Sequence, residues 1–334
     1  VNYYIITVIY FFFALYLIRN IHDVKSVIWT LIISSSGLSL ASLIFAEGEQ
    51  RIAIAGGAND PNDLALLAVT CLPMIVYFML REKGLKKMIL IGSVIISVAA
   101  IVMTFSRGGF LGLLAVSFLM LIRKTGFKSQ FIKYAASAIA IILFLSLTPD
   151  TFWERMGSIT EEMHSDVTDK TDRFSRKTIW MEGLELFYED PVAGVGFGAF
   201  GDALAYHRLD AGGIPKYQTA HNSYVLVLTE TGLVGFGLYL ALIVSSMLTF
   251  RKIRKSGSKT GSQEDIFVYA NLLEISMWGW LVSAFFLSQS YSSMFLLFPA
   301  LAAIMRENVL PDYVRRHESI KEDEYGLPSP AQER

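Results

Sequence analysis

Apolar residues in this chain form long runs that charged or polar residues interrupt only at intervals. A helix needs about 20 mostly apolar residues to cross about 30 Å of hydrocarbon. By this measure the runs predict nine membrane-spanning helices, over residues 3–18, 27–46, 64–80, 88–105, 108–122, 132–148, 222–250, 266–288 and 294–305. The seventh run is long enough to tilt or to break near Thr231-Gly232. We therefore expect an all-α, polytopic membrane protein.

The composition agrees with this pattern and excludes several classes of protein. Of 334 residues, 53% are hydrophobic and only 18% are charged, and the mean hydropathy is +0.45. A soluble domain carries about 25% charged residues, so a soluble enzyme, a disordered protein and a nucleic-acid binder are excluded. The single cysteine, Cys71, lies inside an apolar run and permits neither an intramolecular disulfide nor a cysteine metal cluster.

The placement of charge predicts which end of each helix faces the cytoplasm. Lys and Arg gather in alternate breaks, at Arg19 and Lys25; Arg81, Lys83, Lys86 and Lys87; Arg123, Lys124, Lys128 and Lys133; and Arg251, Lys252, Arg254, Lys255 and Lys259. The positive-inside rule assigns these breaks, and the tail from Arg306, to the cytoplasm. The other breaks, 47–63, 106–107, 149–221 and 289–293, then face outward.

One outward break is much larger than the rest. We divide the chain into six helices over 1–148, a loop over 149–221, three helices over 222–305 and a charged tail over 306–334. Residues 150–220 hold thirteen Asp and Glu against seven Lys and Arg. A helical pattern from Arg173 to Tyr188 and the breakers that follow it predict a folded, partly helical lid over the outer membrane face.

The N-terminus predicts that a piece of the protein precedes this chain. The first residue is Val1, and an apolar run begins at Tyr3 without a basic leader or a small-residue cleavage site. A signal peptide would need both features. The first residue indicates either a lost N-terminal piece or an alternative start codon, and of these we expect a fragment.

Ser106-Arg107-Gly108-Gly109 falls where the fourth predicted helix ends and the fifth begins. Its outward arginine departs from the positive-inside trend. A helix N-terminus with glycines offers exposed N–H donors to an anion, and arginine adds a planar fork for two phosphate oxygens. The motif indicates a phosphate site. The alternative is an interfacial arginine beside glycines that serve helix packing.

Ala220-His221-Asn222-Ser223 stands where the large loop enters the seventh predicted helix. Asn222 or Ser223 would cap that helix, which places His221 at the membrane surface. A histidine there can take a proton from a hydroxyl nucleophile, because its unperturbed pKa is about 6.5. A polar interface residue is the alternative.

Four further features are weaker. Arg173 and Arg176, with Trp180 four residues after Arg176, suit a phosphate or a sugar ring, although a surface packing contact explains them as well. Gly194-Val195-Gly196-Phe197-Gly198 lacks the preceding strand of a dinucleotide site. Asn59-Asp60-Pro61-Asn62-Asp63 could ligate a cation, but a turn and a cap opening the third helix explain it more simply. Carboxylates within predicted spans are functional candidates by default, and these are Glu230 and Glu274, the latter with Asn271 three residues before it.

The motifs resemble those of a known family when they are read in order. They are N-D-P-N-D-L-A (59–65), S-R-G-G (106–109), Arg176 before Trp180, P-V-A-G-V-G-F-G-A-F (191–200), A-H-N-S-Y (220–224) and T-E-T-G-L-V-G (229–235). Six motifs in this order, from about residue 55 to 300, resemble the O-antigen ligase family, which includes some O-antigen polymerases and protein O-oligosaccharyltransferases.

The resemblance implies glycan transfer from an undecaprenyl-diphosphate donor to an acceptor hydroxyl at the periplasmic face of a bacterial inner membrane. It implies inversion and neither a metal ion nor another cofactor. By motif match, Arg107 and Arg176 would hold the diphosphate and His221 would act on the acceptor hydroxyl, while Ser106, Gly108, Arg173, Trp180, Asn222 and Glu230 would help to bind the substrates. Members have about a dozen helices and both termini in the cytoplasm, so three missing helices would restore the arrangement here.

Three functions remain open from the sequence. The first is ligation of a finished glycan onto lipid A–core. The second is a polymerase or protein-glycosylating enzyme with the same donor and another acceptor. The third is a polysaccharide transporter or flippase that uses Glu230 and Glu274, and such a protein would tolerate the loss of His221.

Overall fold

A computed structural model describes residues 2–45, 52–53, 60–123, 176–260, 265–311 and 313–315 of the chain. Within these ranges the protein is helical and contains no strand. The helices are α1 (Asn2–Leu17), α2 (Ile21–Ile44), α3 (Pro61–Arg81), α4 (Gly84–Met103), α5 (Arg107–Ile122), α8 (Arg176–Glu189), α9 (Phe200–Asp210), α10 (Ser223–Thr260), α11 (Asp265–Ala284) and α12 (Ser293–Ile304), which a π-helix (Met305–Val309) continues.

The described helices support a multi-pass membrane protein. Six are long and apolar enough to cross a membrane, namely α2, α3, α4, α10, α11 and the helix that begins with α12, and α1 and α5 are shorter apolar helices. These eight correspond to eight of the nine predicted spans. The remaining predicted span, over 132–148, lies outside the described residues, as do residues 149–175 of the predicted loop and all but the first residues of the tail.

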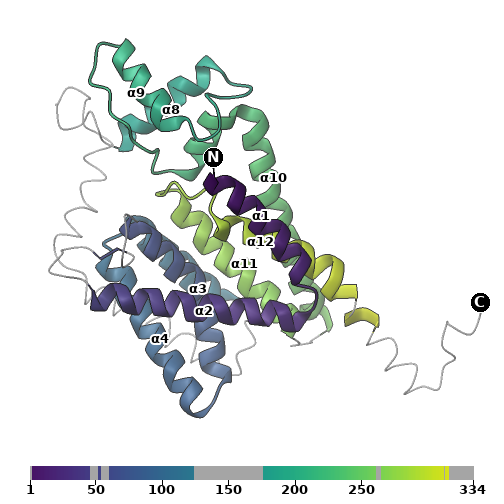
Figure 1. The fold of residues 1–334 in the computed structure, drawn as a ribbon. Coiled ribbons are helices and arrows are strands. Elements are labelled where there is room, and N and C mark those ends of the chain that lie inside the picture. The colour runs from purple at the N-terminus through teal and green to yellow at the C-terminus, as the bar shows by residue number, and fades with distance from the viewer. Residues whose placement is uncertain are drawn as a thin grey trace, which may run out of the picture.

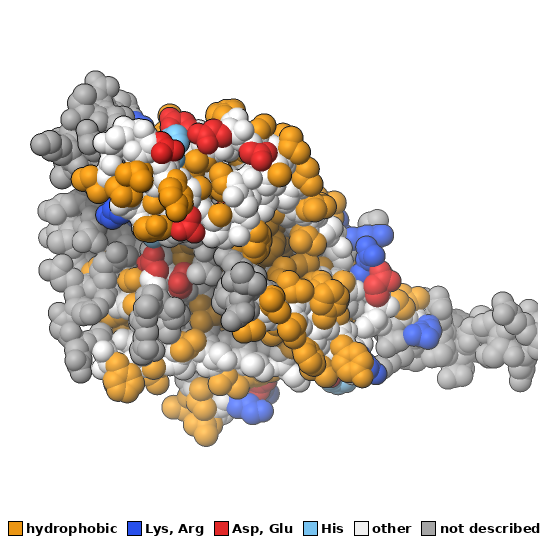
Figure 2. Space-filling view, turned by 45° about the horizontal axis from the view of Figure 1, so that its top comes forward, with side chains coloured by type: hydrophobic (Ala, Val, Ile, Leu, Met, Phe, Trp, Pro, Cys, Tyr) orange, Lys and Arg blue, Asp and Glu red, His pale blue; other side chains and the backbone are white. Residues whose placement is uncertain are grey.

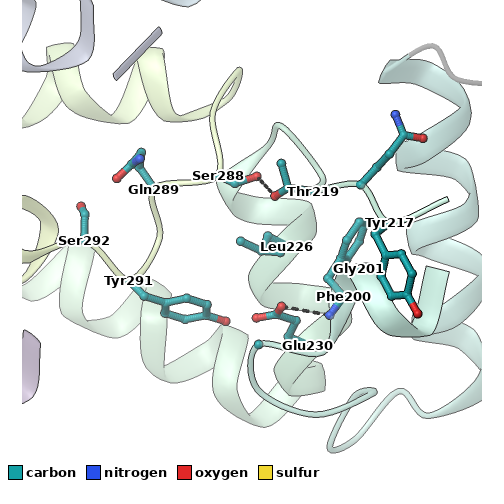
Figure 3. Close-up of a pocket in the computed structure, with 12 residues that line it drawn as sticks. Phe200, Gly201, Tyr217, Thr219, Leu226, Glu230, Ser288, Gln289, Tyr291 and Ser292 are labelled. Carbon is teal, nitrogen blue, oxygen red and sulfur yellow. Dashed lines mark hydrogen bonds between the residues drawn. The ribbon is translucent and has the colours of Figure 1, made fainter. Parts of the chain in front are cut away.

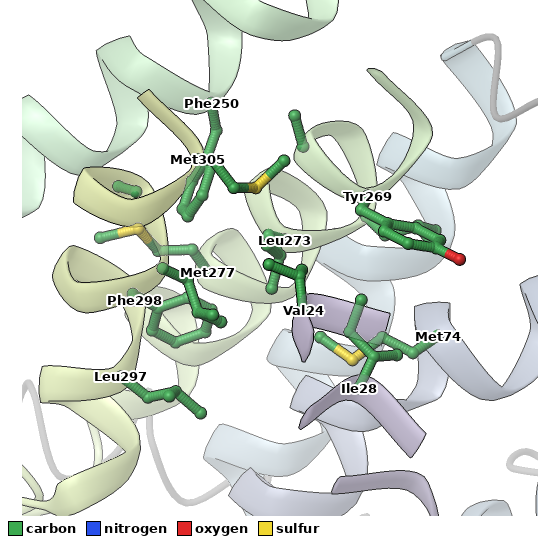
Figure 4. Close-up of a cluster of buried hydrophobic side chains, with 14 of the residues drawn as sticks. Val24, Ile28, Met74, Phe250, Tyr269, Leu273, Met277, Leu297, Phe298 and Met305 are labelled. Carbon is green, nitrogen blue, oxygen red and sulfur yellow. The ribbon is translucent and has the colours of Figure 1, made fainter. Parts of the chain in front are cut away.

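The helices α3 and α11 form the centre of the bundle. Their side chains are buried on nearly all sides, and α11 packs against α3, α5 and α10. Figure 4 shows large apolar side chains of this core meeting, among them Val24 and Ile28 of α2, Met74 of α3, Phe250 of α10, Tyr269, Leu273 and Met277 of α11, and Phe298 of α12. Dispersion between closely fitted side chains is what holds apolar helices together in lipid.

The loops separate to two ends of the bundle as the charge pattern predicts. One end gathers the starts of α3, α5 and α10 and the α11–α12 loop, because Gln289 donates to Asp63 and Ser283 donates to the Gly108 carbonyl. The other end holds arginines: the Glu274 carboxylate contacts both Arg123 (2.9 Å) and Arg254 (2.7 Å). We call the first the site end.

The helix α10 is interrupted, as its length predicted. Its 38 residues would measure about 57 Å as a straight helix, far more than a bilayer needs. The interruption falls at Gly232, whose φ of 59° and ψ of −165° lie in a region open almost only to glycine.

Segment 191–196 is hydrogen-bonded into this interruption. The four bonds run from Val195 N–H to the Thr229 carbonyl (3.0 Å), from Gly196 N–H to the Glu230 carbonyl (3.0 Å), from Leu233 N–H to the Pro191 carbonyl (2.8 Å) and from Val234 N–H to the Val192 carbonyl (3.4 Å). They satisfy backbone groups that a broken helix would otherwise leave unpaired. The two motifs P-V-A-G-V-G-F-G-A-F and T-E-T-G-L-V-G therefore meet in one structural unit, which we call the α10 break.

The helices α8 and α9 form a small layer over the site end (Figure 1). Arg208 of α9 is buried and its Nε donates to both Glu182 oxygens of α8 at 3.0 Å. Glu185 and Glu189 lie 3.1 and 3.4 Å from the two ring nitrogens of His207. Figure 2 shows acidic side chains around a histidine at the outer edge of this layer, above a bundle face with many hydrophobic side chains. These three acidic side chains of the loop are therefore engaged in holding the layer together.

Candidate functional site

His221 is held immediately before α10 in a strained backbone conformation. Its φ is +47°, in the left-handed region that side chains other than glycine rarely adopt. The next residue caps the helix: Asn222 Oδ1 accepts from the N–H groups of Tyr224 (2.9 Å) and Val225 (3.1 Å). The oxygen of Asn222 thus serves the helix cap. This conformation places the imidazole at the start of α10, where a third of the His221 side chain is exposed.

Two opposite charges act on the imidazole of His221. Its Nδ1 lies 3.8 Å from Asp60 Oδ2, an ion-pair distance rather than a hydrogen bond. Burial and the nearby Arg176 guanidinium lower the pKa of His221, and Asp60 opposes them in part. A pKa below the ordinary value keeps the imidazole neutral at neutral pH, which is the state that can accept a proton.

Trp180 fixes the backbone just before His221. Its Nε1 donates to the carbonyl of Ala220, a fully buried residue, at 2.8 Å. Its ring packs edge-on against Phe285, with centroids 5.4 Å apart. Arg176, one turn earlier in α8, lies on the same helix face. Both side chains therefore act on the start of α10. Arg173, the other arginine of this predicted face, lies outside the described residues.

Arg107 is the first residue of α5. Ser106 caps this helix by accepting from the Gly109 N–H at 3.0 Å, and Phe105 before it has a φ of +48°. Phe105 and His221 are the two non-glycine residues with positive φ in the described part of the chain. Each stands just before a helix that begins with a motif residue, which agrees with the tendency of strain to gather at functional sites.

Helix packing accounts for the glycines of S-R-G-G. A Cβ on Gly108 would lie 2.9 Å from Phe286 Cβ, and one on Gly109 would lie 2.6 Å from Ala65 Cβ. Phe286, just after α11, and Ala65 of α3 therefore leave no room for a methyl group at these positions. The packing alternative explains both glycines, and their close fit holds Arg107 at the site end.

Glu230 belongs to the α10 break. The residue is 3% exposed, and its Oε1 accepts from the backbone N–H of Phe200 at 3.1 Å, so it caps the start of α9. Its Oε2 is buried. The Tyr291 hydroxyl points toward this carboxylate (Figure 3).

The Glu230 carboxylate lines a polar cavity of about 510 Å³ at the site end. Hydroxyl, amide and aromatic groups surround it, from the α8–α9 layer, from α10 and from the α11–α12 loop (Figure 3). Thr219 and Ser288 face each other across the rim, with their hydroxyl oxygens 2.7 Å apart. Thr219, which lines the cavity, stands two residues before His221 in the chain.

An apolar groove of about 580 Å³ runs between α10 and α11. It is lined by Tyr224, Leu240, Ile243, Trp278, Leu281, Val282, Phe285 and Phe286. The end of the groove nearest the site end is formed by Phe285, which packs on Trp180, and by Phe286, which contacts Gly108. The groove therefore leads toward both the His221 and the Arg107 motifs.

Sequence reasoning missed three residues of this arrangement. Asp60 was explained as a cap, and it does cap α3 by accepting from Asn62 N–H, but it also faces His221. Gln289 bridges to Asp63 of α3, and Tyr217 lines the cavity. The aspartate stands in the N-D-P-N-D motif, which was a usable signal. Neither Gln289 nor Tyr217 stands in a recognisable pattern.

Comparison with known families identifies the chain. The sequence model of the family described as O-antigen ligase matches residues 92–240. The match covers the S-R-G-G motif, the large loop, the His221 motif and the α10 break. Residues 92–240 therefore carry a domain of the O-antigen ligase family. No curated protein matches it.

The region that matches the O-antigen ligase family contains most of the site. Arg107, Arg176, His221 and Glu230 all fall inside residues 92–240. Asp60, Tyr291 and the apolar side chains contributed by α11 fall outside, and the fold brings them to the same end of the bundle. The match suggests glycan transfer of the O-antigen ligase or polymerase type.

Proposed function

We propose that this protein transfers a glycan from an undecaprenyl-diphosphate donor to an acceptor hydroxyl at the periplasmic face of the inner membrane. The observation that carries this proposal is the position of His221, strained into place at the bundle end between the Asp60 carboxylate and the Arg176 guanidinium. The O-antigen ligase family supplies the reaction class.

The donor is bound by arginines and by the apolar groove. Its polyprenyl chain lies in the groove between α10 and α11, which opens along the bundle side and reaches the Arg107 and His221 motifs. Arg107 and Arg176 bind the diphosphate, because their guanidinium groups pair with two oxygens at once. Their charge also stabilises the diphosphate as it leaves, when its negative charge grows.

His221 acts as the base. The acceptor oxygen forms a bond to the anomeric carbon while the bond from that carbon to the diphosphate oxygen breaks, and the electron pair leaves on the diphosphate. The hydroxyl proton passes to the neutral imidazole. Asp60 stabilises the imidazolium that forms, in the way a carboxylate supports a histidine base elsewhere. Attack from the face opposite the leaving group inverts the anomeric centre, and no metal ion takes part.

Lipid A–core is the acceptor we favour, and a growing glycan or a protein hydroxyl is the alternative. A transporter is disfavoured by the surroundings of its two candidate carboxylates. Glu274 is held by two arginines at the opposite end of the bundle, and Glu230 caps α9. Both have structural duties that explain their presence within the helices.

Reconstitution in lipid tests the proposal. The protein is supplied with an undecaprenyl-diphosphate glycan and a lipid A–core acceptor, and donor consumption and product size are followed. We expect one discrete addition to the acceptor by the wild-type protein. Loss of the base in His221→Ala should lower the rate about 10²–10⁴-fold.

The comparison variant is His22→Ala, which removes an exposed histidine at the start of α2 and should retain the wild-type rate. A ladder of products that remain on undecaprenyl diphosphate would assign polymerisation instead. Near-normal products from a folded His221→Ala protein would contradict the base role.

A further inference from the structure

We propose that the polar cavity beside Glu230 is the subsite for the acceptor, and that it binds an uncharged saccharide ring next to the hydroxyl that attacks. This rests on the proposed function for its place in the reaction. The binding itself rests on the cavity.

The lining of the cavity has the chemistry of a sugar site. Its volume of about 510 Å³ falls in the range of about 300–1,000 Å³ that small-molecule sites occupy. Apart from Glu230, the described side chains that line it are uncharged, and they include the hydroxyls of Thr219 and Ser288 and the rings of Tyr217 and Tyr291. Hydroxyls and aromatic faces bind the polar edges and apolar faces of sugar rings.

Glu230 gives a second, independent sign of a ligand. Its carboxylate is buried at the cavity wall, where the Phe200 N–H and the Tyr291 hydroxyl are its neighbouring donors. A buried carboxylate gains stability from further hydrogen-bond donors. Two neighbouring sugar hydroxyls could donate to this carboxylate, and the position of Oε1, fixed by the Phe200 N–H, sets the direction from which they approach.

The position of the cavity assigns it to the acceptor rather than to the donor. No Lys or Arg is among the described residues that line it, so it does not suit a diphosphate. The donor groove opens between α10 and α11 on the side of Phe285 and Phe286, whereas the cavity lies against α9 and the α11–α12 loop. The segment from Thr219 to Tyr224, which carries His221, separates the two. The attacking hydroxyl and the leaving diphosphate must lie on opposite sides of the anomeric carbon. The cavity and the groove lie on opposite sides of this segment, as the two substrates require.

A binding measurement tests the subsite without relying on transfer. The full chain in lipid nanodiscs is titrated with two soluble probes, a core oligosaccharide released from lipopolysaccharide and an oligosaccharide of one O-antigen repeat, and contact is read by saturation-transfer NMR. The variant is Tyr217→Ala. Its side chain is 67% exposed, so its removal should leave the fold intact. The matched control is Tyr206→Ala, on α9, 64% exposed and outside the cavity lining.

We expect Tyr217→Ala to weaken binding of one probe about tenfold, and Tyr206→Ala to leave it unchanged. Glu230→Gln keeps an oxygen for the Phe200 N–H and should weaken the same probe. The probe that binds identifies the acceptor: core oligosaccharide indicates ligation and repeat oligosaccharide indicates polymerisation. Absence of binding to both probes, or equal binding by the two tyrosine variants, would overturn the subsite.

Kinetics separate this subsite from the proposed function. In the transfer assay, Tyr217→Ala should raise the KM for the acceptor and leave the KM for the donor unchanged. A rise in the donor KM alone would move the cavity to the donor and overturn the assignment. If the wild-type protein transfers no glycan while the probe binds as expected, the proposed function fails and the saccharide site stands.

Discussion

At the scale of single residues, the site combines strain with opposed charges. Two residues with positive φ, Phe105 and His221, stand just before α5, which begins with Arg107, and just before α10. Such conformations cost about 1–3 kcal/mol each and persist only when the surroundings enforce them. The backbone of His221 is fixed on both sides. Trp180 donates to the Ala220 carbonyl before it, and Asn222 after it caps α10.

The opposed charges predict how the activity responds to pH. Because burial and Arg176 lower the pKa of His221, the neutral base survives below the ordinary value of about 6.5. The acid limb of the kcat/KM profile should therefore have its midpoint below that pH. Arg176→Gln removes a positive charge and should move the midpoint up. Asp60→Asn removes a negative charge, keeps a capping oxygen and should move it down. Shifts in the same direction for both variants would contradict the assignment.

Arg107→Lys tests the geometry of the charge at the start of α5. Lysine keeps the positive charge but has a single ammonium in place of the planar fork. We expect the KM for the donor to rise and kcat to fall, together about tenfold or more in kcat/KM. The measurement is steady-state transfer with the donor concentration varied. Wild-type donor kinetics in this variant would exclude a bidentate contact.

At the scale of elements, the α10 break shows what sequence reasoning can and cannot reach. Apolar runs located eight described helices, and the length of the seventh run predicted an interruption near Thr231-Gly232, which the structure confirms. The run could not reveal that segment 191–196 fills the interruption. Those hydrogen bonds join backbone groups more than 30 residues apart, and no periodicity records them. The sequence pattern likewise predicted that Asp60 caps a helix. It could not predict the contact between Asp60 and His221, because the two residues are far apart in the chain.

Gly232→Ala tests the α10 break. A Cβ at Gly232 would lie 2.2 Å from the Val192 carbonyl oxygen, in a conformation that alanine avoids. We expect a loss of at least about 2 kcal/mol of stability, seen as a lower Tm in detergent, together with loss of transfer. Gly237→Ala, in the same helix, has nothing within 4 Å and should leave the Tm unchanged or slightly higher. Equal Tm values for the two variants would contradict the break.

At the scale of the whole molecule, the bundle has a site end and an opposite end, where Glu274 pairs with Arg123 and Arg254. The positive-inside pattern of the sequence predicted this division, and the paired residues at each end agree with it, including Gln289–Asp63 at the first and Arg123–Glu274 at the second. Because charge is read along the chain, this feature of the fold could be predicted well from the sequence.

Cysteine labelling tests which end faces the periplasm. Tyr206→Cys on α9 and Leu85→Cys at the start of α4 place exposed thiols at opposite ends, at side chains that are 64% and 72% exposed. The native Cys71 is buried and should give little background. With a reagent that crosses the outer but not the inner membrane, Tyr206→Cys should label in whole cells. Leu85→Cys should label only after lysis, and the reverse pattern would invert the topology.

The α10 break also governs how relatives of this protein can exchange parts. Residues 191–196 of the large loop and residues 229–234 of α10 are the two halves of one hydrogen-bonded unit. A chimera that imports another loop but ends its insert at the start of α10 would bring together halves of different origin. An insert that runs through residue 234 carries both halves together. The boundary at which specificity can be transplanted therefore lies inside a membrane helix, beyond the visible end of the loop.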